Sequence, residues 1–95
     1  MIKVVAKNYI QEEKMEEIMK LYKELVEKTV NEPGCIKYEL YQDINDTRIV
    51  TMIEEWESIE ALAEHEKSEH FTRIFPLLKD LVTGESDFRI YKKLL

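Results

Sequence analysis

The residues best suited to proton transfer lie close together in the second half of the chain. Both histidines, His65 and His70, follow the only tryptophan, Trp56, within one short segment. An imidazole has an intrinsic pKa of about 6.5 and can exchange a proton near neutral pH. His65 lies three residues after Leu62, toward the buried side of a predicted helix. We therefore expect a reactive pocket here, with His65 as its catalytic base or hydrogen-bond partner.

The two histidines are not expected to share a metal ion. On a continuous helix the five-residue offset separates His70 from His65, so they do not form the i, i+4 pair of many metal sites, and no third ligand is obvious. We predict no metal site. His70 is expected to line the pocket edge and contact a substrate, to cap a helix, or to be exposed. A hydrogen-bonded core histidine is the alternative for His65.

Asn8 is the second candidate for a catalytic role, because its amide could position a hydroxyl group or oxygen. It closes the apolar side of a predicted strand at residues 2–8, although an asparagine there can also hydrogen-bond the turn after the strand. The expected walls of a substrate pocket are the aromatic residues Tyr22, Tyr38, Trp56, Phe71 and Phe75. Packing in the core is the alternative for each of these, since aromatic side chains bury large areas.

Composition limits the partners and the compartment. The 95 residues predict one domain, 1–95, with 44% hydrophobic and 36% charged residues. A net charge of -6 argues against nucleic acid and anionic membranes as partners, because clustered Lys and Arg drive phosphate binding. The single cysteine, Cys35, excludes an intrachain disulfide and fits the reducing cytoplasm. No apolar run is long enough for a signal peptide or a membrane span.

The hydrophobic pattern predicts the order strand, helix, strand, strand, helix, strand. Strands are expected at residues 2–8, 36–42, 48–56 and 87–95, a helix at 12–30, and a broken helical region with N-caps at Ser58 and Ser68, a kink or restart at Pro76 and an end at Gly84. This order is the ferredoxin-like split βαβ arrangement, an α+β fold in which two helices cover one face of a four-stranded antiparallel sheet.

The other face of the predicted sheet also carries apolar residues. The strand at 48–56 places Ile49 and Ile53 opposite Val50 and Met52, so neither face is left to water. A second copy of the chain would cover the open face, which predicts a face-to-face homodimer.

Two segments carry a family resemblance that covers nearly the whole chain. They are Glu32-Pro33-Gly34-Cys35-Ile36 running into Tyr38-Glu39-Leu40, and Glu55-Trp56 followed by Ala61-Leu62, His65 and Ser68-Glu69-His70-Phe71. Together they resemble the antibiotic biosynthesis monooxygenase family of small dimeric α+β-barrel proteins, which includes quinol monooxygenases. In the first segment helix termination and the start of a strand explain the residues, and no chemistry is expected of it.

The resemblance implies an enzyme without metal or flavin, hence without a cofactor. Members of the family deprotonate an electron-rich phenol or quinol, and the resulting anion passes an electron directly to dioxygen. Haem-degrading relatives instead pair the strand asparagine with a Trp and a haem-ligating His. This chain departs from that pattern with His65 at the place of the Trp and Phe75 near that of the His, which disfavours haem degradation.

Three functions remain as hypotheses. The first is a cofactor-independent monooxygenase that acts on a small quinol or polyphenol, with dioxygen as its other partner. The second is an oxygen-independent isomerase of a small metabolite. The third is a dimeric module that binds an aromatic ligand without converting it.

Overall fold

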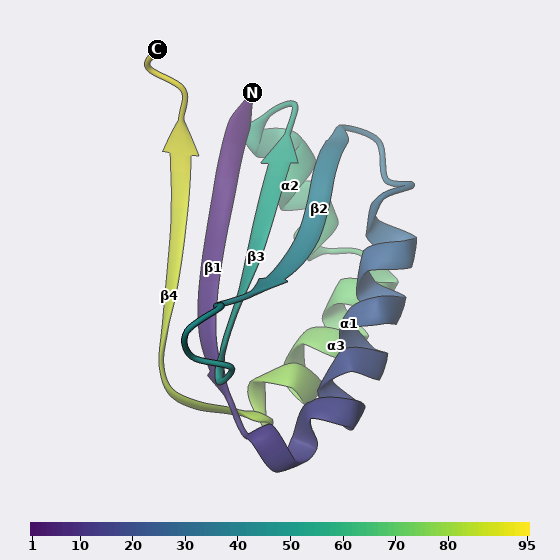
Figure 1. Cartoon of the computed structure of the whole chain (residues 1–95). Coiled ribbons are helices and arrows are strands. Elements are labelled where there is room, and N and C mark those ends of the chain that lie inside the picture. The colour runs from purple at the N-terminus through teal and green to yellow at the C-terminus, as the bar shows by residue number, and fades with distance from the viewer.

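The computed structural model describes all residues, 1–95 (Figure 1). In chain order the elements are β1 (Ile2–Ile10), the 3-10 helix η1 (Glu12–Lys14), α1 (Met15–Thr29), β2 (Cys35–Gln42), β3 (Ile49–Trp56), α2 (Ile59–Glu66), α3 (Glu69–Lys79) and β4 (Val82–Lys92). The strands form one sheet in the order β2-β3-β1-β4, and each neighbouring pair is antiparallel. The predicted ferredoxin-like α+β fold is therefore confirmed.

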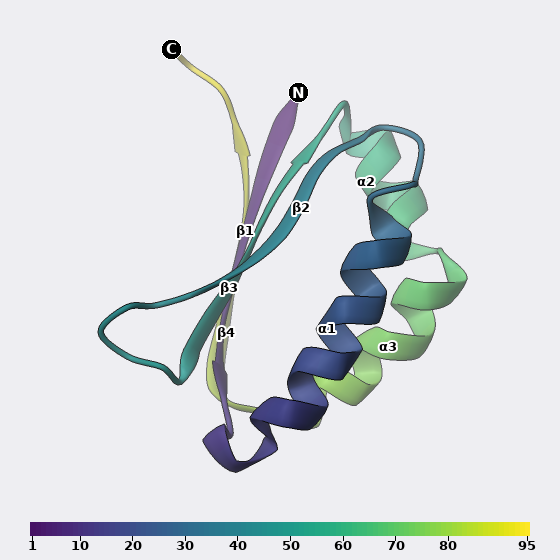
Figure 2. The same ribbon diagram turned by 45° about the vertical axis from the view of Figure 1, so that its right-hand side comes forward.

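All three α-helices lie on one side of the sheet (Figure 2). Strand β3 shows the cause, because its residues alternate between fully buried and half-buried along its whole length. The buried set, including Val50, Met52 and Trp56, meets the apolar stripe of α1 and α3, to which Ile18, Leu25 and Ile74 belong. The core is thus a single layer between sheet and helices.

The helical region begins after Ser58 and is broken at Ser68, as the sequence predicted. The Ser58 hydroxyl accepts a hydrogen bond from the backbone N–H of Ala61, and the Ser68 hydroxyl accepts one from that of Phe71. Each serine therefore starts its own helix. The predicted restart at Pro76 is absent, since α3 continues through that residue to Lys79. No helix is both long and apolar enough to span a membrane.

The last strand begins earlier than the pattern predicts. It starts at Val82, so Gly84 lies inside β4 and does not end the helical region. Pairing with β1 shifts register between Lys7 and Tyr9, and Gly84 has a φ of 67° within the irregular stretch. A bulge of this kind is difficult to read from sequence because the apolar alternation is interrupted rather than extended.

The first strand also extends further than expected, to Ile10. Asn8 consequently lies inside β1 and does not end it. Side chains alternate between the two faces along β1, so Asn8 lies on the same face as Val4 and Ile10, which are both buried under the helices.

The uncovered face of the sheet retains apolar side chains, as predicted. In β3, Ile49 and Ile53 occupy the alternate positions, directed away from the helices, and are half-buried. On the edge strands Tyr41 and Tyr91 are about half exposed. The surface is therefore mixed in character, with aromatic residues among Lys and Glu.

Candidate active site

A cavity of about 410 Å³ lies between the sheet and the helical layer. Six of the eight residues expected to form a site line it, namely Asn8, Tyr22, Tyr38, His65, Phe71 and Phe75. Trp56 and His70 do not line it. Trp56 is completely buried beside the cavity wall, and His70 lies on the far side of His65.

Aromatic rings hold His65 in place. Its ring centroid lies 4.8 Å from that of Trp56, 4.8 Å from that of Phe71 and 5.2 Å from that of Tyr38. The side chain is only 2% exposed. Burial lowers the pKa of His65, and a hydrogen bond with Glu32 opposes that effect. A His65 with a lowered pKa is neutral at pH 7 and can accept a proton.

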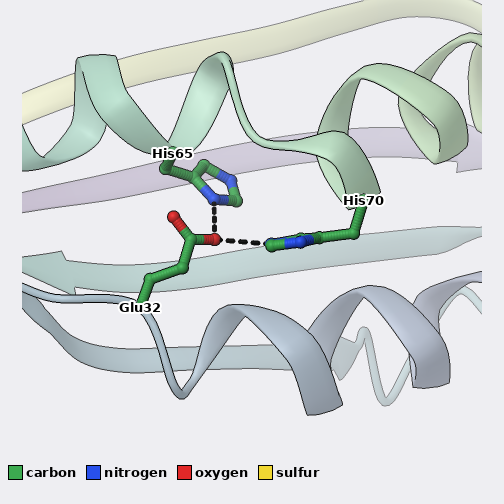
Figure 3. A group of neighbouring side chains, drawn as sticks. All are labelled: Glu32, His65 and His70. Atoms are coloured by element: carbon green, nitrogen blue, oxygen red, sulfur yellow. Dashed lines mark hydrogen bonds and ion pairs between the residues drawn. The ribbon is translucent and has the colours of Figure 1, made fainter.

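Glu32 joins the two histidines. Its Oε2 atom lies 2.7 Å from His65 Nδ1 and 2.6 Å from His70 Nε2 (Figure 3). The expectation that the helix separates the histidines is wrong, because the helix breaks between them, at residues 67–68, and the ring centroids come within 6.1 Å. The Glu32 segment, of which the sequence predicted no chemistry, contributes a carboxylate that contacts both histidines. Glu32 reaches both rings across the fold.

These three side chains are also the one group whose ligand atoms lie close enough to suggest a metal ion, all within 4.8 Å of one another. Zinc bonds of about 2.0–2.2 Å in a tetrahedron separate neighbouring ligand atoms by roughly 3.3 Å. The oxygen of Glu32 is closer than that to both nitrogens, at hydrogen-bond distance. The arrangement here is a hydrogen-bonded cluster.

Backbone contacts fix the turn that carries Glu32 against the helix that carries His65. The carbonyl of Gly34 accepts a 2.8 Å hydrogen bond from the N–H of Glu57. Gly34 has a φ of 84°, and a Cβ at this position would lie 2.6 Å from the Cβ of Ala61 in α2. Glycine is therefore required both by the conformation and by the close approach.

Glu54 is a cavity residue that sequence reasoning missed. It is 5% exposed, and its Oε1 accepts a 2.9 Å hydrogen bond from the indole N–H of Trp56. Burial raises the pKa of Glu54 to about 7, while the Trp56 hydrogen bond acts in the opposite direction and the nearby Glu66 adds to the rise. A signal existed in the sequence, because Glu54 shares its parity in β3 with Met52 and Trp56.

Asn8 lines the cavity from the last third of β1. Its side-chain oxygen accepts a hydrogen bond from the hydroxyl of Ser86, in the irregular stretch of β4, so the amide does not bond the turn after β1. Burial raises the pKa of the neighbouring Tyr22 to about 12, and the Asn8 side chain partly offsets this. The Tyr22 phenol therefore stays protonated.

The cavity lining also includes four charged residues from several elements. They are Lys7, Glu66, Lys79 and Asp87. The site thus combines an apolar aromatic interior with one imidazole, one amide and one buried carboxyl group. That combination suits proton transfer to or from a small aromatic molecule.

Comparison with known proteins identifies the family. The model of the antibiotic biosynthesis monooxygenase family matches residues 1–77. The chain belongs to the antibiotic biosynthesis monooxygenase family. The match includes Asn8, Glu54 and His65, together with both partners of the hydrogen-bonded cluster, Glu32 and His70, and leaves β4 outside.

Two solved structures are closely similar. A conserved protein from Methanosarcina mazei Go1 is 45% identical, with a TM-score of 0.95 over 98% of this chain and 92% of that one. A crystal structure described as an antibiotic biosynthesis monooxygenase is 37% identical, with a TM-score of 0.94 over 100% of both chains. Both likenesses agree with the family and the fold.

A curated relative is longer than this chain. The uncharacterized protein sll1783 of Synechocystis sp. is 31% identical over 90 residues, which are 94% of this chain. The chain spans 61% of the length of that protein.

Proposed function

We propose that the protein is a cofactor-independent monooxygenase that oxidises a small quinol or polyphenol. The observation that carries this proposal is the aromatic-lined cavity into which His65 presents an imidazole with a lowered pKa. Its volume of about 410 Å³ lies in the range of small-molecule sites, and a single substituted ring would be largely enclosed.

The reaction begins with proton transfer. Neutral His65 accepts the proton of a substrate hydroxyl, and Asn8, opposite on β1, orients the hydroxyl or the oxygen. The phenolate is electron-rich enough to pass an electron to dioxygen directly. One oxygen atom then enters a ring C–H bond and gives a hydroxyl group. The hydrogens of the two quinol hydroxyls leave with the other oxygen atom as water, so a quinol and dioxygen give a hydroxyquinone and water. No external reductant is needed for this balance.

The aromatic residues supply the rest of the pocket. Phe71 and Phe75 stack with their ring centroids 5.0 Å apart and present an apolar wall to a planar substrate. The Phe75 side chain is about half exposed, so this wall lies toward the cavity mouth. Trp56 contributes indirectly, through its hydrogen bond to Glu54.

The proposal includes a homodimer in the cytoplasm. The half-buried Ile49 and Ile53 on the uncovered face of the sheet support a face-to-face pairing of two copies. The lone Cys35 fits a reducing compartment. Sedimentation at micromolar concentration tests the pairing, and a monomer there would contradict it.

Oxygen consumption tests the function. Purified metal-free protein is mixed with a panel of hydroquinones and polyphenols in an oxygen electrode, with buffer blanks. At least one substrate should raise oxygen uptake, and His65→Ala should abolish the increase while its circular dichroism spectrum stays unchanged. A panel without any uptake above the blank would contradict the proposal.

An oxygen-independent isomerase is the second candidate, and one observation favours it. The cavity holds two groups whose pKa values burial shifts in opposite directions: the pKa of His65 is lowered and that of Glu54 is raised to about 7. Such a pair can remove a proton at one atom and return it at another. Product formation under anaerobic conditions would select this function.

A ligand that raises the melting temperature yet returns unchanged after aerobic incubation would indicate a binding module.

A further inference from the structure

We propose that Glu32 and His70 are positioning residues that hold His65 in the tautomer whose unprotonated Nε2 atom faces the cavity. The consequence for catalysis rests on the proposed function, in which His65 accepts a substrate proton. The tautomer itself does not depend on that function and can be measured separately.

The first step of the argument is the geometry at a single oxygen atom. Oε2 of Glu32 lies 2.7 Å from His65 Nδ1 and 2.6 Å from His70 Nε2 (Figure 3). A carboxylate only accepts hydrogen bonds, so each of these ring nitrogens must carry a hydrogen. Because a neutral imidazole carries one hydrogen, Nε2 of His65 is then the acceptor.

The second step is the environment of the other ring nitrogen. His65 Nε2 makes no hydrogen bond to the protein. Thr29 Oγ1 is the one unpartnered side-chain polar atom that is fully buried, so Nε2 must keep some accessible surface. The ring as a whole is almost completely buried, and it lines the cavity. The opening at Nε2 is therefore toward the cavity, where a substrate hydroxyl would lie.

The third step is the part of His70. Its N–H is a second donor to the oxygen that holds His65, and its side chain is 13% exposed. Two hydrogen bonds from different helices hold the carboxylate in one orientation. His70 thus acts on His65 through Glu32, without touching the cavity.

The same cluster stabilises the product of proton transfer. Once Nε2 accepts a proton, Nδ1 of the imidazolium lies 2.7 Å from the negatively charged Glu32. The carboxylate then stabilises the positive charge, as the aspartate of a catalytic triad does. The other groups that act on the His65 charge are Glu66 on its own helix, which favours the cation, and His70, which opposes it. Glu54 on β3 also lines the cavity.

Nuclear magnetic resonance of the full protein, with ¹⁵N-labelled histidine, tests the tautomer. Long-range ¹H–¹⁵N correlations at pH 7.5 should show His65 with a protonated Nδ1 and an unprotonated Nε2. In Glu32→Gln the carboxamide can donate to the ring, so the other tautomer should gain population. Glu27→Gln, which changes an exposed glutamate of α1, is the matched control and should leave the His65 signals unchanged. His70→Leu should broaden or split the His65 signals, because one restraint on Glu32 is lost.

Activity gives a second, separate measurement. Glu32→Gln should lower kcat at least tenfold with little change in KM, and Glu32→Asp should restore part of the loss. A protonated Nε2 in the wild-type protein would overturn the proposal without any reference to activity. The expected tautomer without oxidation of any quinol would instead overturn the proposed function and leave the role of Glu32 in place.

Discussion

Glu54→Gln should make the protein more stable at alkaline pH. The carboxyl group of Glu54 has an ordinary pKa of 4.5, and burial raises its pKa to about 7 in the folded protein. The folded state therefore holds the proton more tightly than the unfolded chain. Stability contributed by this group is complete below pH 4.5 and is lost as the pH rises through 7.

The size of the effect can be worked out from the two pKa values. They differ by about 2.5, and one pKa unit corresponds to about 1.4 kcal/mol, so wild-type protein should lose about 3 kcal/mol that Glu54→Gln retains. Glutamine stays neutral at every pH, and its Oε1 can still accept the indole N–H of Trp56. The substitution therefore removes the charge and preserves the hydrogen bond.

Urea unfolding, monitored by the fluorescence of Trp56, measures this. Wild-type and variant are compared from pH 5 to pH 8.5 at one protein concentration, because subunit association shifts apparent stability. The difference between their unfolding free energies should grow by about 2–3 kcal/mol across the range, because a small part of the loss has already occurred at pH 5. Glu57→Gln, an exposed neighbour, is the control and should show no such change. A difference that changes by less than about 1 kcal/mol would refute the assignment of the raised pKa to Glu54.

Three further substitutions test the packing of Trp56 and of the two glycines. Trp56→Phe removes a completely buried indole and its hydrogen bond to Glu54, and should cost about 2–4 kcal/mol in urea unfolding monitored by circular dichroism; a cost below about 1 kcal/mol would contradict the buried position. Gly34→Ala should cost about 2–5 kcal/mol, because its Cβ would lie 2.6 Å from that of Ala61 and φ is positive. Gly84→Ala has a φ of 67° but no atom within 4 Å, so it should cost only about 1 kcal/mol, and equal losses would argue against the contact with α2.

The fold could be predicted because its signals are local. Alternation of apolar residues in β3 and the helical period in α1 each depend on a few neighbouring positions. Ser58 and Ser68 marked the two helix starts for the same reason. The register of β4 could not be predicted, because the bulge around Gly84 depends on pairing with β1, which is distant in the chain.

The parts of the candidate site that depend on local patterns could also be predicted, and those that depend on long-range contacts could not. The positions of Tyr22, Tyr38 and His65 on the inner faces of their elements are given by periodicity, and all three line the cavity. The bond between Glu32 and His65 joins residues 33 positions apart, and no local pattern indicates it. The sequence did indicate the face of Glu54, because it alternates in step with Met52 and Trp56. A charged residue is nevertheless ordinarily assigned to the solvent side.

The number of residues between His65 and His70 decides whether both rings can reach Glu32. His65 ends the buried face of one helix, and His70 opens the next, with both rings meeting the same oxygen of Glu32. One residue added to α2 beyond His65 would turn the start of α3 by about 100° and advance it by about 1.5 Å. His70 would then leave its partner even though no side chain had changed. The exposed surface of α1 can accept many substitutions, whereas the segment between the two histidines can accept almost no insertion or deletion.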